Sequence, residues 1–318
     1  MRRVFALILS WILISCGFSG CRDLGRTSVP NEQNFVSAVG LDREDGVWNL
    51  SITVAGGIEE TTRFLSSTDE TLGKAFERIV AGSVGELRFS HCRAIVLGES
   101  VSEKNLSDAL RFCADRLKIP LSARMISTDN AKRLLTAAEG GNGYEISDVA
   151  DKTAKKLGFG GHTALYEIET ARIQSLSLFA MPRFSGDGLQ ITGLTVYKED
   201  KPVAHLDMGE SRVYAVLRNV FEGGEITNGE ESERIESASS KMDFMLSDDR
   251  LYIDISLHSD PKSKLLFEEV EAVLSVYDTD IFGIELRLER KNPEIYEKIK
   301  SDFEGYYKNA KFTVREGS

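Results

Sequence analysis

Apolar and polar residues alternate between Val47 and Val54. One side of this segment carries Trp48, Leu50, Ile52 and Val54. Alternation with a period of two is typical of a strand with one buried face. Val36 to Leu41 also has the character of a strand, and Asp42 to Gly46 is suited to the turn between the two. The pattern predicts a hairpin whose apolar face must pack against another element.

A helical period replaces the alternation after Thr68, which is a good N-cap residue. The apolar residues that recur on one side of this helix are Leu72, Ala75, Phe76, Ile79 and Val80. We expect a second helix from about Asn105 to Leu117 and mainly helical sequence from Ala131 to Arg172. Short strands are expected at Ala94 to Leu97 and near Arg124 to Ser127. Strands that alternate with helices indicate an α/β or α+β domain.

A new unit begins after the glycine-containing stretch from Ser185 to Gly188, and the C-terminal third is richer in strands. Expected strands are Leu189 to Tyr197, Pro202 to Leu206, Ser239 to Leu246, Leu251 to His258, Ile281 to Leu288 and Lys311 to Val314. Expected helices are Glu210 to Arg218, Leu265 to Val276 and a last helix that Pro293 opens. The fold class is therefore α+β, with mixed or antiparallel sheets flanked by helices in two to three α/β-type domains in series. We place an N-terminal α/β domain at residues 21–185 and a C-terminal α+β domain at residues 186–318.

The first residues resemble a bacterial secretion signal. Arg2 and Arg3 precede an apolar run that is shorter than the roughly 20 residues of a spanning helix. Residues 1–20 are thus expected to be a lipoprotein signal peptide. Two cysteines could accept the lipid: Cys16 follows the better aliphatic residue, whereas Cys21 follows a glycine and precedes a polar stretch. We favour Cys21.

Charge and chemistry argue for a binding protein rather than an enzyme. Acidic residues number 50 against 39 basic ones, a formal charge of -11 that would repel nucleic acid and anionic lipid head groups. The four histidines form no closely spaced pair, and no cysteine motif for zinc is present, so no metal or cofactor is expected. Cys92 and Cys113 are expected to be buried thiols, and a disulfide between them is the alternative.

Several segments carry a resemblance to a known family. They are Cys21-Arg22-Asp23, Ala38-Val39-Gly40-Leu41-Asp42, Ser90 to Glu99, Ile191 to Tyr197 with Asp200 to Val203, and the weaker Asp280-Ile281-Phe282-Gly283. In order and spacing they resemble the C-subunit of spore nutrient germinant receptors, the Ger(x)C lipoprotein family. Arg22 stands where the family has an aromatic residue, and Ser90 stands where it has glycine.

The resemblance implies a non-catalytic lipoprotein on the outer face of the inner spore membrane. It also implies partners, an A-type and a transporter-like B-type integral membrane subunit, with which the protein would trigger germination. A lipid-anchored solute-binding protein of an importer is the alternative, but such proteins usually have two similar lobes. The polar residues His91, Arg93 and Glu99 flank the strand Ala94 to Leu97, and we expect them to form a partner surface rather than an active site.

Overall fold

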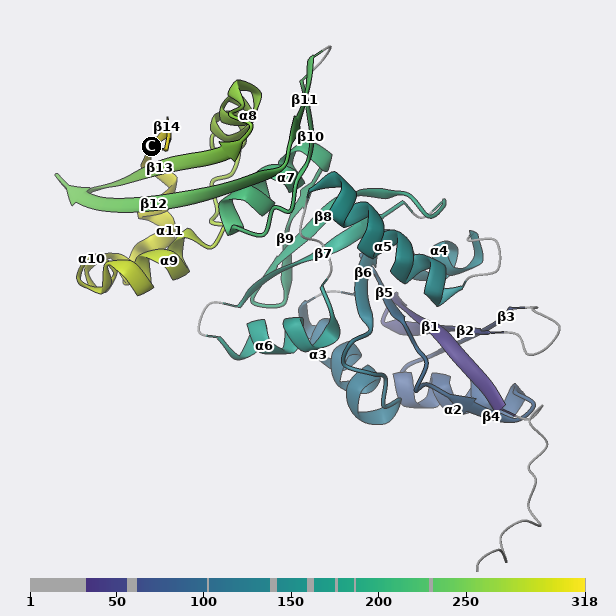
Figure 1. Ribbon diagram of the computed structural model, residues 1–318. Helices are drawn as coiled ribbons and strands as arrows, with labels where there is room; N and C mark the ends of the chain where they lie inside the picture. The colour runs from purple at the N-terminus through teal and green to yellow at the C-terminus, as the bar shows by residue number, and fades with distance from the viewer. Residues whose placement is uncertain are drawn as a thin grey trace, which may run out of the picture.

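The computed structural model describes residues 33–55, 62–101, 103–137, 142–158, 163–174, 177–185, 187–228 and 231–317. A nine-stranded sheet forms the larger part of the molecule (Figure 1). Its strands are β1 (Gln33–Glu44), β2 (Val47–Val54), β3 (Arg63–Asp69), β4 (Glu86–Arg88), β5 (Ala94–Gly98), β6 (Arg124–Thr128), β7 (Leu178–Phe184), β8 (Ile191–Lys198) and β9 (Lys201–Leu206).

The middle of this sheet is parallel and its two sides are antiparallel. The strand order is β3-β2-β1-β5-β6-β7-β8-β9, and β4 pairs with the start of β1. β1, β5, β6 and β7 run in one direction, while the β1-β2-β3 and β7-β8-β9 segments are antiparallel meanders. The carboxyl ends of four strands therefore meet at one edge of the sheet.

Helices cover both faces, because alternate residues of the central strands enter different cores. Ile95 and Leu97 of β5 pack in one core with α2 (Leu72–Gly82), α3 (Glu103–Arg111) and α6 (Leu165–Ile173). Ala94 and Val96 enter the other core with α4 (Ala131–Ala137), α5 (Gly143–Leu157) and α7 (Met208–Arg218). A strand that is buried on both faces explains why this segment reads as a continuous apolar run.

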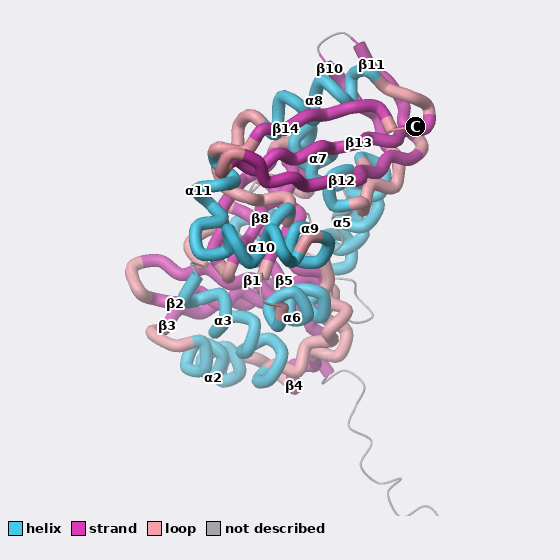
Figure 2. The backbone as a smooth tube through the Cα atoms, turned by 90° about the vertical axis from the view of Figure 1, so that its left-hand side faces the viewer, coloured by secondary structure: helices cyan, strands magenta, loops and turns pink. Residues whose placement is uncertain are grey.

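A three-stranded sheet forms the C-terminal part, at the end of the molecule opposite to β4 (Figures 1 and 2). It consists of β12 (Ser237–Ser247), β13 (Arg250–Asp260) and β14 (Lys311–Glu316), and the hairpin of β10 (Gly224–Asn228) and β11 (Glu231–Ile235) precedes it. The helices here are α8 (Lys264–Leu274), α9 (Ile284–Lys291), α10 (Pro293–Ile299) and α11 (Phe303–Lys308).

The two parts share one hydrophobic core, which extends from Ala38 in β1 to Tyr307 in α11. The expected α+β class, with mixed sheets flanked by helices, is confirmed. The domain boundary that we expect at residue 185 falls between β7 and β8, which are neighbouring strands of the large sheet. The division of the chain into two domains at residue 185 therefore stays a proposal.

Two expected elements are wrong in detail. Residues 63–69 form the edge strand β3, so the following helix begins at Leu72 and is capped by Thr71 rather than Thr68. The Thr71 side chain accepts a hydrogen bond from the backbone N–H of Lys74 at 3.3 Å. Residues 281–288 do not form a strand, because the chain turns at Gly283 and continues as α9.

Candidate functional site

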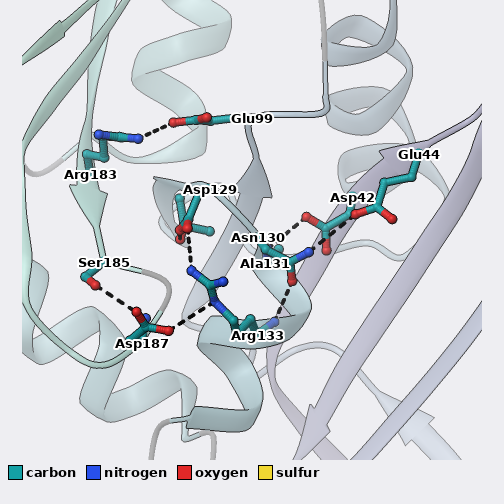
Figure 3. Close-up of polar contacts among 11 residues, drawn as sticks. Asp42, Glu44, Glu99, Asp129, Asn130, Ala131, Arg133, Arg183, Ser185 and Asp187 are labelled. Atoms are coloured by element: carbon teal, nitrogen blue, oxygen red, sulfur yellow. Dashed lines mark hydrogen bonds and ion pairs between the residues drawn. The ribbon is translucent and has the colours of Figure 1, made fainter.

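Polar side chains gather at the carboxyl ends of the four parallel strands, and we call this region the carboxyl edge (Figure 3). Its members are Asp42, Glu44, Glu99, Asp129, Asn130, Arg133, Arg183, Ser185 and Asp187. In open α/β sheets this is the edge at which ligands usually bind. The carboxyl edge is therefore the first candidate for a binding or catalytic site.

Asp42 at the end of β1 is buried, with 1% of its surface exposed. Its carboxylate accepts hydrogen bonds from the backbone N–H groups of Ala131 at 2.8 Å and Lys132 at 2.9 Å, so it caps α4 (Figure 3). Burial raises the pKa of Asp42, and the two hydrogen bonds oppose this rise without cancelling it. The helix N-terminus that could attract an anion is thus occupied by the protein's own carboxylate.

Glu99 follows β5 and forms an ion pair with Arg183 of β7 (Figure 3). It also lies 3.9 Å from Nε2 of His205 in β9. The hydroxyl of Thr195 is 3.2 Å from Nδ1 of His205, and it accepts a hydrogen bond from Ser127 at 2.8 Å. Burial and the nearby Arg183 lower the pKa of His205. This chain of contacts links β5 through β9 across the sheet.

Arg133 of α4 binds two carboxylates that come from different elements. Its guanidinium lies 2.5 Å from Asp129, which follows β6, and 3.3 Å from Asp187, which follows β7. The backbone N–H of Arg133 donates to the Asn130 side chain at 2.7 Å (Figure 3). Both arginines of the carboxyl edge are therefore held in ion pairs, Arg133 with Asp129 and Asp187 and Arg183 with Glu99, which suits a polar binding surface more than a catalytic acid and base pair.

The residues that we expected to form one partner surface lie at opposite edges. Glu99 is at the carboxyl edge, whereas His91 and Arg93 precede β5 and lie at the amino-terminal ends of the parallel strands. The five residues of β5 separate them by about 16 Å. His91 packs edge-on against Phe35 with ring centroids 4.9 Å apart, and the Arg93 guanidinium lies 5.8 Å from the centre of the Tyr144 ring. Cys21 lies outside the described residues.

Gly98 joins two of the segments that carry the family resemblance. A Cβ atom on Gly98 would lie 1.9 Å from Oδ1 of Asp42, and one on Gly40 would lie 2.6 Å from Leu135 of α4. Glycine at both positions lets α4 and its capping carboxylate sit directly on β1 and β5. Sequence reasoning assigned Asp42 to a turn, and it missed that Asp42 lies against Gly98 at the ends of two neighbouring strands.

Asp280 has the same kind of role in the C-terminal part. Its buried carboxylate accepts hydrogen bonds from the backbone N–H groups of Phe282 and Ile284, both at 3.0 Å, and Glu285 at 2.8 Å. Gly283 is held at a φ of +73°, and a Cβ atom there would lie 2.1 Å from the Arg218 guanidinium. The weaker family-like segment is therefore the cap of α9.

Cys92 and Cys113 are both buried and free. Burial raises the pKa of Cys92 to about 12 and raises that of Cys113 as well. Within the described part of the chain, no group of three or more histidine, cysteine, aspartate or glutamate residues could hold a metal ion. None of the helices in that same part is long and apolar enough to cross a membrane.

Comparison with known proteins identifies the class of this fold. Residues 27–184 match the family model described as the spore germination protein N-terminal domain, and residues 262–315 match the one described as spore germination B3/GerAC like, C-terminal. These matches define a spore germination protein with an N-terminal and a C-terminal module. The chain belongs to the GerAC-like family, the C-subunits of germinant receptors.

The fold is also similar to the crystal structure of the GerBC protein. The similarity has a TM-score of 0.51 at 13% sequence identity, and it covers 87% of this chain and 95% of that chain. At this identity the similarity shows the fold alone. The search of curated proteins gives no match.

Proposed function

We propose that this protein is a non-catalytic, lipid-anchored subunit of a nutrient germinant receptor. It would be held through Cys21 on the outer face of the inner spore membrane and work with A-type and B-type integral membrane subunits. Membership of the GerAC-like family supports the receptor role. The lipid anchor rests on the lipobox-like Phe18-Ser19-Gly20-Cys21 segment. Two or three acyl chains hold a protein durably at a membrane, whereas one chain does so only marginally.

One observation carries the non-catalytic part of the proposal. The family-like segments supply buried scaffold contacts, in which Asp42 and Asp280 cap helices and Gly98 and Gly283 make room for neighbouring groups. Several exposed carboxylates beside them are in ion pairs, such as Glu99 with Arg183. Segments of this kind preserve a shape that a partner can recognise. This role requires neither an activated nucleophile nor a group that transfers protons.

We infer that the carboxyl edge contacts an integral membrane subunit. Glu99, Arg133, Arg183 and Asp187 come from separate elements and present both signs of charge on one surface. Charges of this kind are typical of the polar rim of a protein–protein interface, where they fix orientation and select the partner. Glu99 directly follows β5, Arg183 is in β7 and Arg133 is in α4, so elements of the sheet and its covering helix place these charges.

The test of this surface is a charge exchange. Glu99→Arg and Arg183→Glu each break the internal ion pair, and the double variant restores an ion pair with reversed polarity. If these charges contact a membrane subunit, the folded double variant should still co-purify little of the membrane subunits and should still germinate poorly. Lys241→Glu is the control, because Lys241 forms an exposed ion pair with Asp243 on the distant β12. Normal germination in the double variant would show that the ion pair between Glu99 and Arg183 is an internal contact with no role in partner binding.

The anchor is tested separately. We expect Cys21→Ala to release the protein from membranes or to leave it unprocessed, and intact-mass analysis should find the lipid on Cys21. Lipid on Cys16 with Cys21 dispensable would contradict the assignment. A solute-binding role is less well supported, because the nine-stranded and three-stranded sheets differ and share one core instead of forming two similar lobes around a cleft.

A further inference from the structure

The amino-terminal ends of the parallel strands form a second exposed surface, the amino-terminal edge, defined by Phe35, Val84, Arg93, Leu121 and Tyr166. Phe35 is at the start of β1, and the Val84 carbonyl accepts a hydrogen bond from the neighbouring Asn34 side chain. The backbone N–H of Arg124 donates to the Arg93 carbonyl at 2.8 Å, which joins the starts of β5 and β6. The N–H of Tyr166 donates to the Leu121 carbonyl at 3.0 Å, which places α6 beside them.

Large apolar side chains point outward along this edge. Val84 is 80% exposed, Leu121 54%, Tyr166 50% and Phe35 38%. They come from β1, from the loops before β4 and β6, and from α6, so no single amphipathic element explains them. A row of exposed apolar residues contributed by several elements is typical of a surface that is covered in the working protein.

The charge of this edge is opposite to that of the chain as a whole. Arg63, Arg93 and Lys118 are exposed, and none of them forms an ion pair with a described residue. Arg63 begins β3 and donates a hydrogen bond to the Asn34 side chain, while Lys118 is in the loop that leads to Leu121.

Two carboxylates of the edge are paired with arginines, whereas a third, Glu167, is bonded to the backbone and keeps its charge. Arg88 lies 2.7 Å from Glu86, and Arg124 lies 2.8 Å from Asp151. The carboxylate of Glu167 accepts a hydrogen bond from the backbone N–H of Ala164 at 2.7 Å. The edge therefore has three cations without an ion pair to a described residue, against the uncompensated charge of Glu167, although the chain has a net charge of -11.

The start of β1 connects this edge to the proposed anchor. Cys21 is twelve residues before Gln33, and such a segment reaches at most about 40 Å when it is fully extended. We propose that the amino-terminal edge lies against an anionic lipid surface, with Val84, Leu121 and Phe35 in the interface and Arg63, Arg93 and Lys118 among the head groups. This inference rests on the proposed lipid anchor.

The chemistry of the edge fits a bilayer interface. The amphipathic ring of Tyr166 is favourable at head-group depth. Lysine and arginine near an anionic leaflet gain electrostatic attraction that decays over a Debye length. An edge that contacts lipid would also fix how the rest of the protein faces its membrane partners, which a flexible tether alone cannot do.

The experiment uses single exposed cysteines in the full-length lipoprotein, reconstituted in vesicles that contain phosphatidylglycerol. Val84→Cys and Leu121→Cys report on the edge, and Met245→Cys is the matched control, since Met245 is 56% exposed on β12 at the other end of the molecule (Figure 1). The buried thiols of Cys92 and Cys113 should not react with the fluorophore.

Lipids that carry a quencher should reduce the fluorescence at positions 84 and 121 several-fold more than at position 245. Combining Arg63→Glu with Arg93→Glu should weaken that quenching on anionic vesicles. Equal quenching at all three positions in protein that floats with vesicles overturns the lipid contact and leaves the anchor intact. If the labels at positions 84 and 121 become inaccessible only when the membrane subunits are added, the edge contacts a protein partner. That result would also overturn the proposed lipid contact. Protein that does not float, and that reacts at Cys21, would reject the anchor and this inference together.

Discussion

Gly98 and Asp42 are in contact, although they are 56 positions apart in the sequence: a methyl group on Gly98 would lie 1.9 Å from Oδ1 of Asp42. Gly98 ends β5, and Asp42 is near the end of the adjacent parallel strand β1. The carboxylate cannot move away, because the backbone N–H groups of Ala131 and Lys132 hold it. This relationship fixes β1, β5 and α4 against one another at the carboxyl edge.

The first prediction follows from that contact. Gly98→Ala should lower the free energy of unfolding by about 2–3 kcal/mol, because the new methyl group must displace a buried, hydrogen-bonded carboxylate. Urea denaturation followed by circular dichroism measures the change. Gly73→Ala in α2 is the control: nothing lies within 4 Å of a Cβ atom there, so it should raise stability by about 0.5–1 kcal/mol. Equal stability of the two variants would contradict the contact.

The second prediction concerns pH. The pKa of Asp42 in the folded protein is raised above its ordinary value of 3.8, so the folded state binds this proton more tightly than the unfolded state. The stability that the group contributes is complete below 3.8 and is lost as pH rises through the folded pKa. The difference in free energy of unfolding between wild type and Asp42→Asn should therefore shrink as pH rises. A difference that grows with pH would show that the hydrogen bonds outweigh burial.

The sequence predicted the central strands well, because their patterns are local. The alternation of Val47 to Val54 and the apolar run of Ala94 to Leu97 both correspond to strands of the large sheet. β7 was not predicted, because it contains Pro182, a residue that removes a backbone donor. The structure accommodates Pro182 because β7 pairs with β6 only at Arg183 and Phe184.

The carboxyl edge was largely beyond prediction for a different reason. Its contacts join residues far apart in sequence, such as Glu99 with Arg183, and no local spacing encodes them. The sequence did place Glu99 at a strand end. The same prediction placed His91 and Arg93 before the strand, and residues at the two ends of one strand lie at opposite edges of a sheet, so the expectation of a single partner surface was wrong.

The third prediction compares two nearby aspartates. Asp280→Ala should lower the free energy of unfolding by about 2–3 kcal/mol, because three backbone N–H groups at the start of α9 lose their buried acceptor. Asp278→Ala is the matched control, since Asp278 is exposed and forms only a surface ion pair with Lys308 at 3.2 Å. Its effect should stay within about 0.5 kcal/mol. Similar losses in both variants would reject the capping role of Asp280.

The last prediction tests how the β8–β9 turn is held. Asp200 in this turn has a φ of +66°, and both of its carboxylate oxygens accept hydrogen bonds from Arg172 of α6, the shortest at 2.7 Å. Ser107 of α3 donates to the same carboxylate at 3.1 Å. A guanidinium binds two oxygens in a fixed plane, whereas an ammonium group acts as a point charge, so Arg172→Lys should not preserve the contact.

We therefore expect Arg172→Lys and Asp200→Asn each to destabilise the protein by about 1–2 kcal/mol. In a double-mutant cycle the combined loss should be clearly smaller than the sum, because both changes remove the same pair. Lys152→Ala serves as the comparison, since Lys152 forms an exposed ion pair with Asp148 at 2.7 Å and its removal should have little effect. Additive losses at Arg172 and Asp200 would mean that the turn is held by its own backbone and not by α6.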